Sequence, residues 1–230
     1  MKAAPESTLF CWSGGKDSAM ALDAILKSAD VRVASLLTTV TEGYDRISMH
    51  GVRRELLERQ AESIGLPLRQ VFIPPECVNP VYEARMGEAM QQEYARGIRK
   101  VVFGDIFLED LRAYREQNLA KIGMTGLFPL WKRDTSELSR HLVTAGFRAV
   151  AACVDSRVVD SSFAGRELDE SFFRDLPPGV DPCGENGEFH SFVFDGPIFR
   201  APVRFTLGEV VQRGPFCFCD LIPSANEDTK

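Results

Sequence analysis

The sequence predicts an α/β protein: a doubly wound parallel sheet near the N-terminus, followed by a smaller α+β domain. Three observations predict this fold class. Short apolar runs alternate with segments of helical periodicity up to about residue 105, which is typical of a parallel sheet with crossover helices. A glycine-rich stretch at residues 13–18 joins the first apolar run to the first helical segment. From Gly187 onwards, phenylalanines interrupted by prolines favour β-structure over another crossover unit.

The N-terminal part predicts four strands with helices between them. Apolar residues recur at helical spacing within the helices, and the second helix should end at Gly65, with Pro67 beyond it. The predicted strands are residues 8–12, 31–40, 68–73 and 100–103, and the predicted helices are residues 17–27, 52–64 and 80–96.

The C-terminal part is less regular. We expect helices over residues 109–121, 135–145 and 163–176, a strand over 148–154 and a β-rich segment after Gly187. The expected boundaries are 1–125 for the sheet domain, 126–223 for the α+β domain and 224–230 for a disordered tail.

Composition narrows the class of protein. The chain has 230 residues, a net charge of -6 and 44% hydrophobic residues, which is typical of a globular protein. No apolar run is long enough to cross a membrane and the N-terminus does not resemble a signal peptide, so we expect a cytoplasmic protein without a membrane partner. Its acidic balance makes nucleic acid an unlikely partner. The six cysteines lack zinc-type spacing and are expected to be reduced.

The stretch at residues 13–18 carries the strongest chemical signal. Adjacent glycines allow a sharp turn that brings backbone N–H groups near an anion, and the following helix presents its positive end to the same point. The spacing differs from the Gly-x-x-x-x-Gly-Lys-Ser/Thr loop. The different spacing favours a loop that binds the pyrophosphate leaving group, so that attack occurs at the α-phosphate of ATP, over a loop for γ-phosphate transfer. A capped strand-to-helix turn without a ligand is the alternative. The cofactor-binding residues predicted here are Ser13, Gly14, Gly15, Lys16, Asp17 and Ser18.

This loop resembles that of the N-type ATP pyrophosphatase (PP-loop) superfamily, whose fold is the adenine nucleotide alpha hydrolase type. Four further segments are similar to the diphthine–ammonia ligase family, and the resemblance runs from residue 8 to about residue 200. These segments are Met49-His50-Gly51-Val52-Arg53, Val102-Phe103-Gly104-Asp105-Ile106, Pro129-Leu130-Trp131, and Gly184-Glu185-Asn186-Gly187-Glu188-Phe189-His190 with Asp195-Gly196-Pro197.

The resemblance implies an ATP-dependent ligase with magnesium. Members activate a carboxylate as an acyl-adenylate, release pyrophosphate and let ammonia displace AMP. The family's own substrate is a modified histidine on elongation factor two, which is present in eukaryotes and archaea. A chain from a bacterium would need a different carboxylic acid as its substrate. Residues 1–125 would then bind ATP and residues 126–223 the substrate. A homo-oligomer is possible for such a chain.

Several site residues follow from position and from the resemblance together. Gly104 and Asp105 follow a predicted strand, where ligands bind in open α/β sheets. Asp105 is therefore a candidate catalytic residue that would hold magnesium or a nucleotide hydroxyl, with a helix cap as the alternative. Glu185 and Glu188 flank glycines and are candidate catalytic and substrate-binding residues, which would bind an amine ligand, or ammonium before its deprotonation, although a solvated turn would look the same. The remaining candidates are Lys16 and Gly104 for the nucleotide, with Lys16 also catalytic, and His50, Gly51 and His190 for the substrate.

Other interpretations stay open at this point. A tRNA-modifying enzyme of the same superfamily would need an RNA-binding surface and a catalytic cysteine. A regulatory module would hold the nucleotide without turnover. Arg112 and Arg115 lie three residues apart on one predicted helix face. They are expected to form salt bridges with neighbouring acidic residues, although they could neutralise a phosphate.

Overall fold

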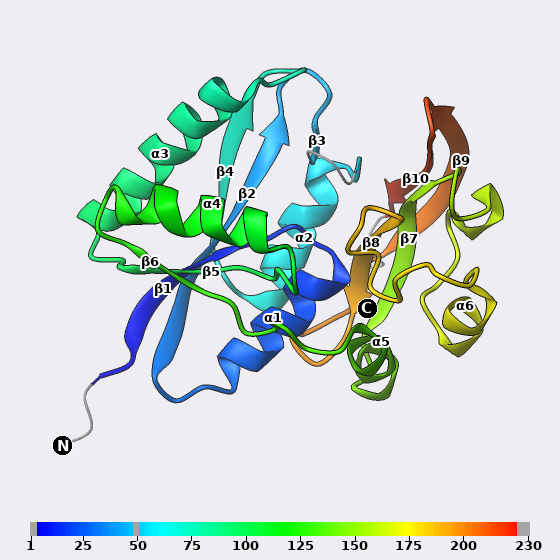
Figure 1. Cartoon of the computed structure of the whole chain (residues 1–230), viewed down its shortest axis with the longest axis horizontal. Coiled ribbons are helices and arrows are strands. Elements are labelled where there is room, and N and C mark those ends of the chain that lie inside the picture. Colours follow the sequence, from blue (N-terminus) through cyan, green and yellow to red (C-terminus); the bar gives the residue numbers. More distant parts are fainter. Residues whose placement is uncertain (1–3, 48–50, 225–230) are drawn as a thin grey trace, which may run out of the picture. The chain divides into compact units, whose positions relative to one another are not determined.

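A computed structural model of the chain describes residues 4–47 and 51–224 (Figure 1). It divides into two compact units. Unit 1 comprises Met1–Ser13, Asp17–Ser48 and Leu66–Arg133, and unit 2 comprises Gly14–Lys16, Met49–Gly65 and Asp134–Lys230. The middle of the glycine-rich loop therefore groups with unit 2, although its two ends belong to unit 1.

Unit 1 contains the parallel sheet. Its parallel strands lie in the order β4-β2-β1-β5-β6, and the short β3 pairs antiparallel with the end of β2. The strands are β1 (Glu6–Cys11), β2 (Val31–Thr41), β3 (Arg46–Ile47), β4 (Leu68–Ile73), β5 (Lys100–Val102) and β6 (Thr125–Leu127). Counted along the chain, the parallel strands run third, second, first, fourth, fifth, which is the doubly wound order with its switch point between β1 and β5. The predicted fold class is confirmed.

One apolar core of unit 1 lies between this sheet and two of its helices. These are α3 (Asn79–Ala95) and α4 (Glu109–Ala120) (Figure 1). Met90 of α3 and Leu119 of α4 join a buried apolar cluster with Leu9 of β1 and Val101 of β5. The central strands β1 and β5 contain consecutive buried residues, as expected for a parallel sheet that is covered on both faces, whereas Phe72 of β4 is exposed. The remaining helix, α1 (Lys16–Leu26), follows the loop directly.

Unit 2 is built on an antiparallel sheet with the order β8-β7-β10-β9. Its strands are β7 (Arg148–Asp155), β8 (Phe189–Asp195), β9 (Phe205–Arg213) and β10 (Phe216–Pro223), and its helices are α2 (Arg54–Ile64), α5 (Thr135–Thr144), the 3₁₀ turn η1 (Ser161–Phe163) and α6 (Glu170–Asp175). The β-rich segment predicted after Gly187 is confirmed. Helix α2 is tied to the sheet where Arg53, at its N-terminus, pairs with Asp220 of β10 at 2.6 Å.

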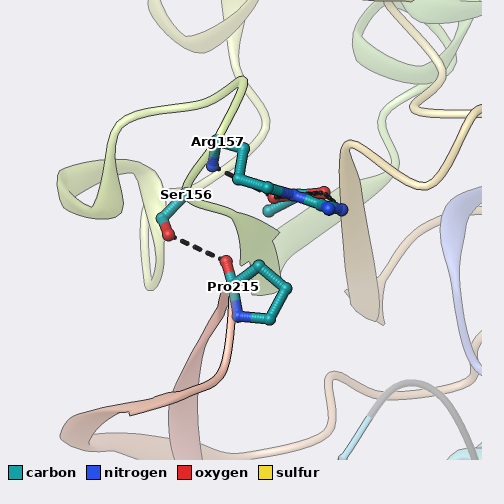
Figure 2. Close-up of polar contacts among 4 residues, drawn as sticks. Ser156, Arg157 and Pro215 are labelled. Atoms are coloured by element: carbon teal, nitrogen blue, oxygen red, sulfur yellow. Dashed lines mark hydrogen bonds and ion pairs between the residues drawn. The ribbon is translucent and has the colours of Figure 1, made fainter.

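Polar contacts close one end of this sheet (Figure 2). The Ser156 hydroxyl, just after β7, donates to the Pro215 carbonyl of the β9–β10 turn at 2.8 Å. The next residue, Arg157, folds back onto Asp155, and its Nη2 lies 2.5 Å from the Asp155 carboxylate. The Ser156 contact joins the β7 end to the β9–β10 hairpin, and the Arg157 contact is local to the β7 end.

The helix predicted over residues 163–176 is wrong. Only η1 and the short α6 form there, because the chain turns at residues 164–165, where Gly165 has φ of +87°, and Glu167 then makes an isolated antiparallel bridge with Val150. Helix α6 starts after Asp169, whose carboxylate accepts from the Phe172 N–H at 2.8 Å and caps the helix. The short strands β3 and β6 were not predicted.

Two predictions fall at or beyond the limits of the described chain. The predicted tail at 224–230 lies outside the described residues except for Ser224. Among the described helices, none is long and apolar enough to serve as a membrane span. The predicted domain boundary and the cytoplasmic location stay predictions.

Candidate functional site

In unit 1 the candidate site begins where β1 ends. The Ser13 and Ser18 hydroxyl oxygens lie 2.7 Å apart, and the Ser13 N–H donates to the Ser18 hydroxyl at 3.2 Å. Gly104 follows β5 closely, and a Cβ there would lie 3.0 Å from the Ser18 nitrogen. Only glycine lets the two backbones approach this closely. The structure thus brings together three predicted nucleotide-binding residues at the switch point of the sheet.

Asp105, the next predicted residue, forms an ion pair with Arg115 of α4. The Arg115 Nε lies 2.8 Å from one carboxylate oxygen, and its Nη2 donates to the other at 3.2 Å. Burial disfavours the charged guanidinium, but the nearby Asp105 carboxylate outweighs it and raises the pKa of Arg115. The ring of Phe103 lies under the guanidinium, 4.5 Å from its centre. Asp105 is therefore the counter-ion of an arginine, with 11% of its side chain exposed.

The neighbouring Arg112 follows the salt-bridge prediction. Its Nε lies 2.9 Å from the Glu116 carboxylate, one helical turn along α4. Its guanidinium also lies 4.6 Å from the ring centres of Phe128 and Trp131. Arg115 departs from the prediction in its partner, because it pairs with Asp105 instead of with an acidic residue of its own helix.

In unit 2 the middle of the loop is held by α2 and β8. Gly14 has φ of +79°, a conformation that costs little only for glycine. Its carbonyl accepts from the Gln60 side-chain amide at 3.0 Å and from the Val193 N–H at 2.9 Å. The same Gln60 amide donates to the Val193 carbonyl at 2.5 Å. Gln60 is fully buried, so this contact is shielded from water.

Lys16 is also buried within unit 2. Its N–H donates to the Ser191 hydroxyl of β8 at 3.1 Å. Its ammonium donates to the Cys183 carbonyl and lies 5.3 Å from the centre of the Phe189 ring. The sequence predicts that successive loop N–H groups face an anion, and the Lys16 N–H departs from this prediction because it is directed at Ser191.

The second predicted element, residues 184–190, begins within a turn at residues 181–188. Glu188 is buried, and its carboxylate accepts from the Asp181 N–H at 3.1 Å, the Asn186 N–H at 2.9 Å and the Asn186 side-chain amide at 3.0 Å. Burial raises the pKa of Glu188, but these hydrogen bonds outweigh burial and the pKa lies below its ordinary value. Glu188 is thus an ionised group that holds its own turn.

Asp181 has the same role from the other end of the turn. Its carboxylate accepts from the N–H groups of Cys183 at 2.8 Å and Glu185 at 3.3 Å, and from the Thr135 hydroxyl at 2.7 Å. Gly184 allows the chain to turn, since it has φ of +66° and a Cβ there would meet the Phe189 carbonyl at 2.8 Å. The turn therefore has a fixed geometry that presents the predicted residue Glu185.

The predicted substrate residues have different surroundings. His190 follows the turn on β8, and burial, aided by the Lys16 charge, lowers the pKa of its imidazole to about 4. It is therefore neutral at neutral pH. Gly51 has φ of +66°, and a Cβ there would lie 2.8 Å from the Phe218 ring of β10. His50 lies outside the described residues.

Sequence reasoning missed the residues that hold these two segments in place. Gln60 and Ser191 contact the loop from 46 and 175 residues away. A single sequence carries no signal for such distant pairs, because a buried glutamine on a helix and a serine on a strand are unremarkable by themselves. Asp181 could have been found as a short acidic residue just before a glycine turn.

The described residues offer a poor protein-built magnesium site. Within residues 4–47 and 51–224, His, Cys, Asp and Glu side chains form no cluster of three or more that could hold a metal ion. The predicted ligand Asp105 faces Arg115 with both carboxylate oxygens. A divalent cation prefers oxygen ligands that are not already neutralised by a guanidinium, so Asp105 does not fit that role in this geometry.

The sheet order, the loop at the switch point and the Ser-Gly-Gly-Lys-Asp-Ser sequence define the class: a Rossmann-like α/β protein of the PP-loop ATP pyrophosphatase type. Comparison with known families narrows this class. The diphthamide synthase N-terminal domain matches residues 6–126, and the diphthamide synthase C-terminal domain matches residues 134–221. The chain belongs to the diphthamide synthase family, which confirms the predicted resemblance.

Curated relatives of the chain carry the name diphthine–ammonia ligase. The protein of Schizosaccharomyces pombe is 27% identical over 226 residues, covering 90% of this chain and 37% of that protein. The Bos taurus protein is 26% identical over 228 residues, covering 90% of this chain and 85% of its own length. The Homo sapiens protein is 26% identical over 221 residues, covering 86% of this chain and 82% of its own length. The chain thus spans little more than a third of the fission yeast relative and most of the mammalian ones.

Proposed function

We propose that this protein is an ATP-dependent, amide-forming ligase that cleaves ATP to AMP and pyrophosphate. The observation that carries the proposal is the loop at residues 13–18, which lies at the switch point of a doubly wound sheet. The family assignment and the names of the relatives support it. The name of those relatives gives diphthine and ammonia as the two groups that are joined. We propose the same pair for this chain, with a carboxylate as the acceptor group.

The first half-reaction forms the adenylate. A carboxylate oxygen of the acceptor attacks the α-phosphorus of ATP, and the bond from that phosphorus to the bridging oxygen of the β-phosphate breaks. Negative charge then accumulates on the departing pyrophosphate. Lys16 and the N-terminal end of α1 are the groups that would stabilise this charge. The Lys16 side chain is long and has rotatable bonds, so its ammonium can exchange the Cys183 carbonyl for a phosphate oxygen.

The second half-reaction forms the amide. Ammonia attacks the acyl carbon, the bond from that carbon to the AMP oxygen breaks, and the nitrogen loses a proton to a base. Glu185 is the proposed group that binds ammonia and accepts this proton, because its turn is fixed by Asp181 and Glu188. Glu188 contributes by shaping the turn, since its carboxylate is occupied by hydrogen bonds from the turn. His190 adds a neutral imidazole beside the turn.

Partners and metal follow from the same proposal. A protein-borne acceptor on elongation factor two is the expectation from the family resemblance. Magnesium, where present, would be bound by the phosphates of ATP, because Asp105 is paired with Arg115. None of the steps above runs through the metal ion.

Two of the six cysteines, Cys11 and Cys153, give little support to the tRNA-modifying alternative. Sulfur transfer requires a reactive thiolate. Burial raises the pKa of the Cys11 thiol to about 12, and burial likewise raises that of Cys153 to about 12. Both groups are protonated at neutral pH, which makes them poor nucleophiles.

The proposal is tested by following both products. The protein is incubated with ATP, magnesium, ammonium and a protein carrying diphthine; AMP is resolved from ADP, and the acceptor is examined by mass spectrometry. We expect AMP, pyrophosphate and an acceptor amide in equal amounts, all of which require ammonium for continued turnover. Formation of ADP would contradict the proposal. Unchanged ATP in the presence of a competent acceptor would favour the regulatory nucleotide-binding module.

A further inference from the structure

Two residues that the mechanism does not use hold the middle of the loop from outside. The Gln60 side-chain amide donates to the Gly14 carbonyl at 3.0 Å and to the Val193 carbonyl at 2.5 Å. The Ser191 hydroxyl, two residues earlier on β8, accepts from the Lys16 N–H at 3.1 Å. All of these residues belong to unit 2. Gln60 is fully buried and Ser191 is buried, so water does not compete for these contacts.

These contacts determine the orientation of the peptide planes in the loop. In a trans peptide, the carbonyl of one residue and the N–H of the next point in opposite directions. The Gly14 carbonyl is directed at Gln60 and Val193, so the Gly15 N–H is directed away from them. A rotation of this peptide plane would break the two hydrogen bonds at Gly14 and would turn the Gly15 N–H to the other side.

The space around Gly14 strengthens this conclusion. A Cβ at Gly14 would lie 2.8 Å from the Gln60 side-chain oxygen and 3.2 Å from a Leu57 methyl carbon. The α2 side chains therefore press closely against the loop as well as bonding to it. A glutamine is suited to this position because its amide supplies a donor for two carbonyl oxygens without adding a charge.

We propose that Gln60 and Ser191 are positioning residues for nucleotide binding: they fix the loop so that the Gly15 N–H and the Lys16 side chain meet the pyrophosphate part of ATP. This rests on the proposed function of the loop. Neither residue touches the nucleotide. Each acts by holding backbone groups that would otherwise have to be ordered when ATP binds, and such ordering lowers affinity.

The test uses the whole chain, three variants of Gln60 and Ser191, and one control variant. Gln60→Met keeps the volume but removes the donor, Ser191→Ala removes the hydroxyl, and Ser191→Thr restores a hydroxyl. Ser139→Ala is the matched control, because Ser139 is also buried and its hydroxyl donates to the Ser136 carbonyl within α5. ATP affinity is measured by calorimetry, and stability by urea denaturation at a temperature where every variant is folded.

We expect Gln60→Met and Ser191→Ala each to weaken ATP binding about tenfold, which corresponds to the loss of one well-placed buried hydrogen bond. Ser191→Thr should recover most of the affinity. Ser139→Ala should bind ATP like the wild type even if it is equally destabilised. Wild-type ATP affinity in both Gln60→Met and Ser191→Ala would overturn the inference. An equal loss of ATP affinity in Ser139→Ala would also overturn it. Failure of the wild-type protein to bind ATP would instead contradict the proposed function.

Discussion

The loop at residues 13–18 and the turn at residues 181–188 look alike in sequence, since each combines two glycines with charged residues. They are held in opposite ways. Distant groups on α2 and β8 hold the Gly14 carbonyl and the Lys16 N–H of the loop. The turn is held by its own carboxylates, Asp181 and Glu188, which accept from its backbone. A charged side chain in a glycine turn can therefore serve to hold the turn itself. The residues that hold a binding loop, by contrast, can lie far from it in the sequence.

The largest effect on stability is expected from filling the space beside the loop. Gly14→Ala combines a left-handed backbone with a Cβ placed 2.8 Å from the Gln60 side chain. The backbone costs about 1–2 kcal/mol and the crowding a similar amount, so we expect a loss of about 2–4 kcal/mol in the free energy of unfolding. Urea denaturation measures this loss.

Gly43→Ala separates the two causes. Gly43 has nearly the same φ, +78°, but nothing lies within 4 Å of a Cβ there. Its loss should be about 1–2 kcal/mol, from the backbone alone. Equal losses in the two variants would show that the contact between the loop and α2 is loose.

The next largest effect is expected from His190, which follows the turn on β8. This residue should make the stability of the protein depend on pH. Folded His190 stays neutral down to about pH 4, whereas the unfolded side chain takes up a proton below about pH 6.5. The unfolded state thus binds more protons between these values, and stability falls as the pH is lowered through this window. The loss from this residue should be about 2 kcal/mol at pH 5.

His190→Gln removes this contribution. The difference in unfolding free energy between pH 7 and pH 5 should be smaller in this variant than in the wild type by about 2 kcal/mol. His141→Gln, on α5, serves as the control for loss of a histidine elsewhere. If both variants lose stability on acidification as steeply as the wild type, burial of His190 does not act on stability.

A smaller effect distinguishes the two glutamates of the turn. Glu188→Gln replaces an acceptor of three hydrogen bonds and should lower stability by about 1–2 kcal/mol. Glu185→Gln should change stability by less than about 0.5 kcal/mol while lowering the rate of amide formation. Thermal denaturation and single-turnover kinetics check the pair. The reverse pattern, with Glu188 silent in stability, would exchange the roles assigned to the two carboxylates.

Much of the fold could be predicted because its signals are local. The strand at Leu68–Ile73 matches its prediction, and most helices lie within two residues of theirs, since apolar periodicity and terminal glycines mark them. The helix predicted over 163–176 failed because a bridge between Glu167 and Val150 overrides the helical pattern. The short β3 and β6 carry too few residues for a periodic signal.

The candidate site was predictable in part for the same reason. The loop and Gly104 are recognisable by glycine spacing and by position after a strand. The ion pair of Asp105 with Arg115 and the contact of Gln60 with Gly14 depend on tertiary packing. Local sequence patterns cannot show that Asp105 is ion-paired with Arg115 or that Gln60 contacts the loop.

Binding of pyrophosphate itself tests the central claim most directly. Calorimetric titrations of pyrophosphate and of AMP are compared for the wild type, Lys16→Ala and Lys27→Ala, whose exposed lysine pairs with Asp23 on α1. We expect Lys16→Ala to weaken pyrophosphate binding roughly 10- to 100-fold, as for a lost bond to a charged group, and to leave AMP binding unchanged. Lys27→Ala should match the wild type. Undiminished pyrophosphate affinity in Lys16→Ala would contradict the claim that this loop holds the leaving group.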